Sequence, residues 1–428
     1  MKTEKTIYKN DNIGAQYTVY HHSSGPDIYL MKMEGFSTVN AAFATRYGSV
    51  NTTFKTKNDD DFKTVPMGIA HYLEHKLFEN EDCDVFELYA KTGANGNAYT
   101  SFDQTVYTFS CTENYLDSLA ILLDFVQAPY FTEQSVEKER GIIAQEIKMC
   151  SDSPERQCFY NLLKAMYKEH PVRIDIAGTV ESIQEITPEL LYKCYNSFYN
   201  LHNMILVVVG NIDEDDIIAV CNEHLKSSEE EELQVRFPDE PYAVAQDIIT
   251  ERFTVGTPLF NIGFKCDAVS GSELLKRQLC ANILIQLISN SASPLYKSLY
   301  EQGLINNAFS SEVFFGEGYF SCIFDGESND PIKVRDMIIE EIERIKSEGI
   351  DSNRFEMIKK SMYGSIVWEF NNTEICANNL VAAGLLRIDL FETTDLLAKI
   401  TEKDLMDSID TLFDTKRVAV SIIENIEN

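Results

Sequence analysis

Runs of apolar residues, some alternating with polar ones, predict β-strands along the first part of the chain. The predicted strands lie at residues 16–20, 27–33, 41–47, 97–102, 105–111 and 204–209. Apolar residues three and four positions apart predict helices at residues 83–92 and 115–127, followed by a helix-rich stretch before the last of these strands. Strands and helices therefore both contribute to residues 1–225.

A similar order of elements recurs in the second part of the chain. The pattern predicts a strand at 259–264, a helix at 273–289, a hairpin at 308–315 and 318–324, helices at 333–347 and 352–370, and a strand at 417–422. The matching order suggests an internal duplication. A run of serine and glutamate at 227–232, followed by Pro238 and Pro241, predicts a linker. We therefore predict one half at 1–225, a charged linker at 226–245 and a second half at 246–428.

The segment at residues 71–75 reads His-Tyr-Leu-Glu-His and places metal-binding and acid–base side chains together. Apolar residues at positions 69, 73 and 77 predict a packed amphipathic helix through it. On such a helix His75 lies about 40° around the axis from His71 and Glu74 about 60° to the other side, so the three share one face. Zinc binds imidazole nitrogens, and hydrolysis needs a carboxylate base beside the metal-bound water. The order H-x-x-E-H is typical of inverzincins. A surface helix with two unrelated histidines is the alternative.

A catalytic zinc site needs a third protein ligand, and residues 136–149 offer one. Apolar positions at 142, 143, 147 and 149 predict a helix with one buried face. Glu139 and Glu146 lie seven residues apart, hence about 20° apart around that helix. Glu146 would complete a His₂Glu site, and Glu139 would orient a ligand or a bound water. Spacing alone does not choose Glu146 over Glu137, and a solvated acidic face is the alternative.

The overall composition narrows the function classes. Acidic residues number 68 against 37 basic ones, and the net charge of −31 argues against a nucleic-acid partner. The chain has no apolar run long enough for a membrane span, and residues 1–16 lack the apolar core of a signal peptide. The ten cysteines show no paired spacing, which favours reduced thiols and a cytoplasmic location. Cys150 is more simply a buried structural thiol than a zinc ligand.

The motifs resemble those of peptidase family M16, which includes pitrilysin, insulin-degrading enzyme and the mitochondrial processing peptidases. The resemblance rests on the H-x-x-E-H segment, on the later Glu139-x₆-Glu146, and on several further segments that follow in order through most of residues 20–215. Those further segments are Gly68-Ile69-Ala70, Lys76-Leu77-Phe78, Gly96-Asn97-Ala98-Tyr99-Thr100, Phe125-Val126-Gln127-Ala128-Pro129, His170-Pro171, Gly178-Thr179 and Asn203-Met204.

The resemblance implies a role for each residue of the motif. His71, His75 and Glu146 would bind one Zn²⁺ per chain, Glu74 would be the general base for the attacking water, and Glu139 would support the site. The implied activity is that of a zinc metalloendopeptidase. The implied fold is α+β, with two homologous halves, each an antiparallel sheet covered by helices, that face each other as a clam shell. The second half would be the metal-free copy.

The resemblance also implies how a substrate is held. Asn97, Ala98 and Thr100 would belong to an edge strand that pairs with an extended peptide or unfolded protein. One departure concerns the second half, where family members carry an Arg and a Tyr in a segment like L-R-E-x-x-G-L-x-Y. Here Tyr300 stands where the Arg is expected, and an asparagine replaces the Tyr.

The chain length and the lack of a second tandem motif pair indicate the short, dimer-forming branch of the family, and the departure in the second half indicates that a partner is needed. We expect a homo- or heterodimer in which an M16-like paralogue completes the site. A non-catalytic scaffold or binding subunit of the same fold is the alternative function. The complete set of His71, Glu74, His75 and Glu146 argues against it, because a scaffold needs no base beside a metal. A processing protease with one dedicated target and a general peptidase remain indistinguishable from the sequence.

Overall fold

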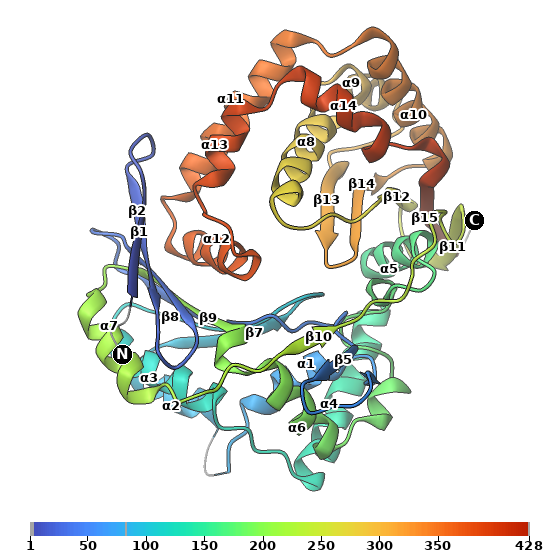
Figure 1. Cartoon of the computed structure of the whole chain (residues 1–428). Helices are drawn as coiled ribbons and strands as arrows, with labels where there is room; N and C mark the ends of the chain where they lie inside the picture. Colours follow the sequence, from blue (N-terminus) through green and yellow to red (C-terminus); the bar gives the residue numbers. More distant parts are fainter. Residues whose placement is uncertain (1–3, 82–83, 427–428) are drawn as a thin grey trace. The chain divides into compact units, whose positions relative to one another are not determined.

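The structure, a computed structural model, describes residues 4–81 and 84–426 and divides the chain into two compact units (Figure 1). The first unit comprises residues 1–147, 176–236 and 365–393, and the second comprises 148–175, 237–364 and 394–428. Each unit thus takes one segment from beyond the predicted boundary at 226–245. The division at that linker stays a prediction, and residues 233–235 within it form a strand that pairs with residues 54–56.

The first unit contains a seven-stranded sheet, a small three-stranded sheet and the helices that cover them. Its strands are β1 (Glu4–Asn10), β2 (Ala15–His21), β3 (Asp27–Lys32), β4 (Val39–Thr45), β5 (Thr53–Thr56), β6 (Lys63–Thr64), β7 (Asn95–Thr100), β8 (Thr105–Cys111), β9 (Met204–Gly210) and β10 (Leu233–Val235). Its helices are α1 (Ile69–Leu77), α2 (Val85–Thr92), α3 (Tyr115–Val126), most of α4 (Glu133–Ser151), α6 (Pro188–Phe198), α7 (Glu214–His224) and α12 (Thr373–Leu386).

The second unit contains a five-stranded sheet and its own helices. Its strands are β11 (Ile248–Phe253), β12 (Leu259–Cys266), β13 (Ser310–Gly316), β14 (Tyr319–Glu327) and β15 (Val418–Asn425). Its helices are α5 (Pro154–Met166), α8 (Ser272–Ser289), α9 (Pro294–Glu301), α10 (Pro331–Glu348), most of α11 (Ser352–Glu369), most of α13 (Glu392–Lys399) and α14 (Glu402–Leu412).

Five strands of the larger sheet, β3-β9-β4-β8-β7, have the same topology as the five-stranded sheet. The strand order is β1-β2-β3-β9-β4-β8-β7 in the first unit and β11-β15-β12-β14-β13 in the second. In each sheet the last strand along the chain lies inside the sheet and runs parallel to one neighbour, β9 to β3 and β15 to β11. The remaining pairs are antiparallel. The duplicated α+β fold is therefore confirmed, with one parallel pair in each sheet that was predicted to be antiparallel.

The centre of the sheet in the first unit is buried on both faces, since every residue of the neighbouring strands β4 and β9 is buried. Ala41 and Phe43 face a core that contains residues of α1, α3, α4, α6 and α7. Ala42 and Ala44 point the other way and pack in a second core with α12. Figure 1 shows α12 and α1 on opposite sides of the sheet. Asn40 ties α12 to β4, because its side-chain amide donates a buried hydrogen bond of 2.7 Å to the Thr373 hydroxyl.

In the second unit, α5 occupies one face of the sheet. A Cβ at Gly263 of β12 would lie only 2.6 Å from the sulfur of Met166, so a glycine there lets α5 approach closely. The next residue, Phe264, points to the other face and packs against Phe413, with ring centroids 5.3 Å apart. Each sheet is thus covered by a helix that is distant from most of its unit in the sequence. In the first unit this is α12, from the C-terminal part of the chain, and in the second unit it is α5, from the N-terminal part.

Most predicted elements are confirmed, although their bounds shift by a few residues. Helix α2 begins at Val85, and residue 83, where it was predicted to begin, lies outside the described residues. The nine cysteines in the described part of the chain are free thiols, and eight of them are buried. Within the residues that the structure describes, no helix has both the length and the apolar content needed to cross a membrane.

Candidate metal centre

Helix α1 begins where the backbone passes close to a neighbouring loop. Gly68, just before the helix, has φ +87°, a conformation that favours glycine. A Cβ at this position would also lie 2.4 Å from the carbonyl oxygen of Ala177. The apolar residues spaced by four, Ile69, Leu73 and Leu77, are buried in the core as the sequence pattern predicts. The opposite face of α1 therefore points in a defined direction.

That face brings two imidazoles to one carboxylate of α4. His71 Nε2 lies 3.5 Å from one carboxylate oxygen of Glu146, and His75 Nε2 lies 3.5 Å from the other. Ligand atoms of the three residues all lie within 4.8 Å of one another. Glu137 is not part of this group, because its side chain is 71% exposed and pairs with Arg140. The structure thereby separates the two glutamates that spacing alone left open.

The donor set fits a zinc ion. Zinc–ligand bonds of 2.0–2.2 Å in a tetrahedral site would place neighbouring ligand atoms about 3.3–3.6 Å apart. The two N···O separations of 3.5 Å agree with that spacing. They are also long for direct hydrogen bonds. Two imidazoles and one carboxylate form the same ligand set as a catalytic His₂Glu zinc site. Cys150 is not one of the grouped ligands.

Glu139 is not one of the three grouped residues, but its carboxylate contacts His75 and holds that imidazole in place. Its carboxylate is 3.0 Å from Nδ1 of His75 and is largely buried. When the Nδ1–H of His75 donates a hydrogen bond to this carboxylate, Nε2 of His75 is left without a proton and directed toward Glu146. Burial by itself would lower the pKa of His75, but the hydrogen bond to Glu139 and the charges of Glu74, Glu139 and Glu146 raise it above its ordinary value. In the described residues, the buried Nδ1 of His71 has no such partner.

Glu74 is buried beside the histidines, with 8% of its surface exposed. The Thr100 hydroxyl donates a hydrogen bond of 2.7 Å to the Glu74 carboxylate. Thr100 is the last residue of β7, so this bond joins helix α1 to the edge of the sheet. The sequence predicted Thr100 as part of a substrate-binding strand. Nothing in the residue spacing indicated that its hydroxyl contacts the carboxylate of Glu74.

Strand β7 is the edge of the seven-stranded sheet, as predicted for Asn97, Ala98 and Thr100. The amide N–H of Ser101 donates to the carbonyl of Gln104, which makes these two residues a hydrogen-bonded pair. In antiparallel pairing the pattern alternates, so the main-chain groups of residues 96, 98 and 100 point to the free edge. The Ala98 N–H is capped there by the side-chain oxygen of Asn97, at 2.9 Å.

Two tyrosines, one in each unit, have contacts that the sequence pattern did not predict. The hydroxyl of Tyr72, an unspecified position of the motif, donates to the carbonyl of Val136 and so joins α1 to α4. Tyr300, which stands where an arginine was expected, is half exposed in the second unit, and its ring stacks on Tyr296 at a centroid distance of 6.0 Å. The first residue helps to position the ligands, whereas the second offers no guanidinium.

The fold and the donor set together define a class: a duplicated α+β protein with an inverzincin-type site in one unit. Residues 63–180 match the family model described as insulinase (peptidase family M16), and residues 185–362 match the one described as the peptidase M16 inactive domain. A Bacillus subtilis (strain 168) protein named uncharacterized zinc protease YmfH is 38% identical over 412 residues, which are 95% of this chain and 96% of that protein. The chain belongs to peptidase family M16.

Solved structures agree with this assignment. A crystal structure of an M16-like peptidase from Alicyclobacillus acidocaldarius covers 99% of both chains with a TM-score of 0.91 and 33% identity. A protease from Helicobacter pylori covers 96% of this chain and 99% of its own at a TM-score of 0.83. Its 18% identity makes it a likeness of fold alone.

Proposed function

We propose that this chain is a zinc-dependent endopeptidase in which His71, His75 and Glu146 hold one Zn²⁺ and Glu74 is the general base. The observation that carries the proposal is the buried Glu74 carboxylate, which lies beside a three-ligand group and is hydrogen-bonded to an edge strand. The names of the relatives, zinc proteases, support it. A non-catalytic scaffold would have no use for this combination.

Each residue has a separate task in the proposed reaction. A bound zinc ion supplies Lewis-acid polarisation of a carbonyl and makes water acidic enough to react near neutral pH. Glu74 accepts a proton from the attacking water at its carboxylate and later delivers it to the leaving amine. Thr100 holds one oxygen of that carboxylate, so that Glu74 stays oriented between transfers. Glu139 keeps His75 in one tautomer.

The free edge of β7 supplies the proposed substrate contact. An extended peptide would add to the sheet by pairing with the main-chain groups of Gly96, Ala98 and Thr100. The Asn97 side chain must leave the Ala98 N–H before a peptide carbonyl takes its place. Because backbone pairing needs an extended segment, the substrate class is peptides and unfolded proteins. The free, mostly buried thiols of the described cysteines support a cytoplasmic location.

We also propose that a paralogous partner subunit completes the site. An oxyanion stabiliser contributes about 2.7–4 kcal/mol to catalysis, and this chain has Tyr300 and an asparagine where the family carries an arginine and a tyrosine. The partner would supply those side chains.

The test is to purify the chain alone and together with its M16-like paralogue and to measure peptide hydrolysis with and without a zinc chelator. We expect chelator-sensitive hydrolysis that is about 100-fold or more faster for the pair. Equal rates for the chain alone and for the pair would contradict the partner, and hydrolysis that persists without metal would contradict the zinc enzyme.

The contact between Thr100 and Glu74 leads to a further prediction. In Thr100→Val the shape is kept but the hydroxyl is lost, so kcat should fall by about 10-fold or more, the worth of a hydrogen bond to a charged group. Zinc content and KM should change little, and Thr100→Ser should restore most of kcat because it restores the donor. If the serine variant were as slow as the valine variant, packing rather than the hydrogen bond would be responsible.

A further inference from the structure

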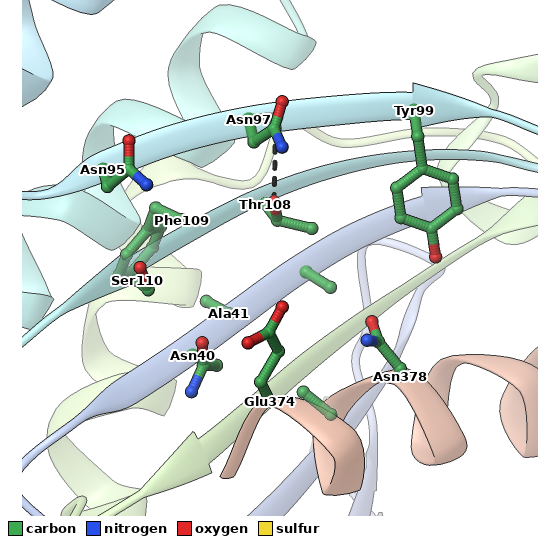
Figure 2. A pocket seen from close by; sticks show the side chains of 12 residues that line it. Asn40, Ala41, Asn95, Asn97, Tyr99, Thr108, Phe109, Ser110, Glu374 and Asn378 are labelled. Carbon is green, nitrogen blue, oxygen red and sulfur yellow. Dashed lines mark hydrogen bonds between the residues drawn. The ribbon is translucent and has the colours of Figure 1, made fainter.

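A polar pocket of about 230 Å³ lies in the first unit, between α12 and the face of the sheet formed by β4, β8 and β7 (Figure 2). Pockets that hold whole small-molecule ligands are commonly about 300–1,000 Å³. This one is therefore better suited to a single long side chain. Polar groups dominate its lining, and those used below are Asn95, Asn97, Tyr99, Thr108, Glu374 and Asn378.

The pocket is continuous with the proposed substrate strand. Side chains alternate along β7, so Asn95, Asn97 and Tyr99 face the pocket, whereas Ala98 packs toward the core that contains α1. Thr108 lies opposite Asn97 on the neighbouring strand and lines the same pocket. One strand thus presents residues to the metal-bearing side and to this pocket in turn.

A peptide added to the edge would follow the same alternation. In an antiparallel addition, the peptide residue that pairs with Ala98 points its side chain to the side of α1. The peptide residues immediately before and after it point to the opposite side, next to Asn97 and Tyr99. A side chain from one of these two positions can enter the pocket without leaving the strand.

The chemistry of the lining favours a cationic guest. Glu374 is the one carboxylate among the residues that line the pocket. Figure 2 shows it pointing from α12 toward the strands, with Asn378 one helical turn away. Among the described residues, the Glu374 carboxylate makes no ion pair. The surrounding amides and hydroxyls offer further acceptors, which suit the five N–H donors of arginine or the three of lysine.

Glu374 could instead serve only to stabilise helix α12. It lies in the first turn of α12, where a negative charge is favourable to the helix dipole. That role would not require the carboxylate to face a pocket beside the edge strand. The net charge of −31 adds a general attraction for basic peptides but gives no positional preference.

We propose that this pocket is a substrate subsite that selects arginine or lysine at a position adjacent to the residue paired with Ala98, with Glu374 as the selecting charge. The proposal rests on the proposed peptidase function, because it assumes that a peptide adds to β7. It narrows the substrate class to peptides that carry a basic side chain near the cleaved bond.

The test compares matched peptides that differ at one scanned position, with arginine, glutamine or glutamate there. The full chain is used, with its partner where activity requires it. For the wild type we expect kcat/KM for arginine to exceed that for glutamate by about 10-fold or more at one position. Glu374→Gln should reduce this ratio severalfold, and Glu374→Lys should invert it. Glu189→Gln is the matched control, because Glu189 is an exposed first-turn carboxylate of α6 outside the pocket.

Binding of the same labelled peptides to a Glu74→Gln chain, measured by fluorescence anisotropy, separates the two proposals. If the chain hydrolyses the peptides but shows no charge preference that depends on Glu374, the subsite proposal is overturned and the peptidase proposal is kept. Arginine-dependent binding that Glu374→Gln weakens, without hydrolysis by the wild type, would support the subsite and overturn the peptidase. Absence of both hydrolysis and binding would overturn both.

Discussion

Replacing Glu74 with glutamine is expected to lower kcat for peptide hydrolysis by about 10²–10⁴-fold, the usual contribution of a general acid–base. Glutamine keeps the shape of the side chain and can still accept the hydrogen bond from Thr100 through its amide oxygen. It cannot take a proton from water near neutral pH. Zinc should remain bound, because Glu74 is not one of the three grouped ligands. Peptide turnover and zinc content are therefore measured on the same preparation.

Glu137→Gln is the control for this substitution. It makes the same change of charge on α4, at a side chain that is 71% exposed and paired with Arg140. We expect its turnover to match the wild type. A Glu74→Gln chain that kept more than about a tenth of wild-type kcat would be inconsistent with Glu74 as the base.

Replacing Glu146 with glutamine is expected to abolish tight zinc binding. The substitution leaves only two strong ligands, His71 and His75, where a catalytic site has three. The measurements are zinc content after dialysis and the shift in melting temperature on adding zinc. Zinc at 100 times its dissociation constant should stabilise the wild type by about 2.7 kcal/mol, because it binds only the folded site. The variant should show no such shift.

Glu139→Gln gives a graded comparison within the same helix. It removes the charged acceptor at Nδ1 of His75 but keeps all three grouped ligands, so zinc affinity should fall by about 10–100-fold rather than vanish. Equal zinc binding by the wild type and Glu146→Gln would place the metal elsewhere. Loss in Glu139→Gln as complete as in Glu146→Gln would make Glu139 a ligand instead.

Local features of the site were predictable because they depend on neighbours along the chain. The spacing of residues 69, 73 and 77 predicted a buried stripe on α1, and that stripe directs His71, Glu74 and His75 to one face. The hairpin of β7 and β8 followed from alternation and was confirmed. Strand β1 was not predicted, because its glutamate, two lysines and one asparagine dilute the apolar pattern at an exposed edge of the sheet.

Contacts between distant segments were not predictable from spacing. Tyr72 reaches Val136, and His75 reaches Glu139, each across 64 positions. Glu137 and Glu146 have the same chemistry, and only the packing of α4 decides that one meets the histidines while the other is exposed. The pocket beside β7 depends on α12, which the sequence pattern did not predict and which lies far along the chain from the strands that it covers.

The sequence by itself determined the ligand types, the helix that carries two of them and the α+β character of both parts, because periodicity acts within a few turns or strands. Only the tertiary structure decided which glutamate joins the histidines, which hydroxyl holds Glu74 and which helix closes the second face of the sheet. Those outcomes arise from packing between segments far apart in the chain, where the burial of many side chains together sets each position.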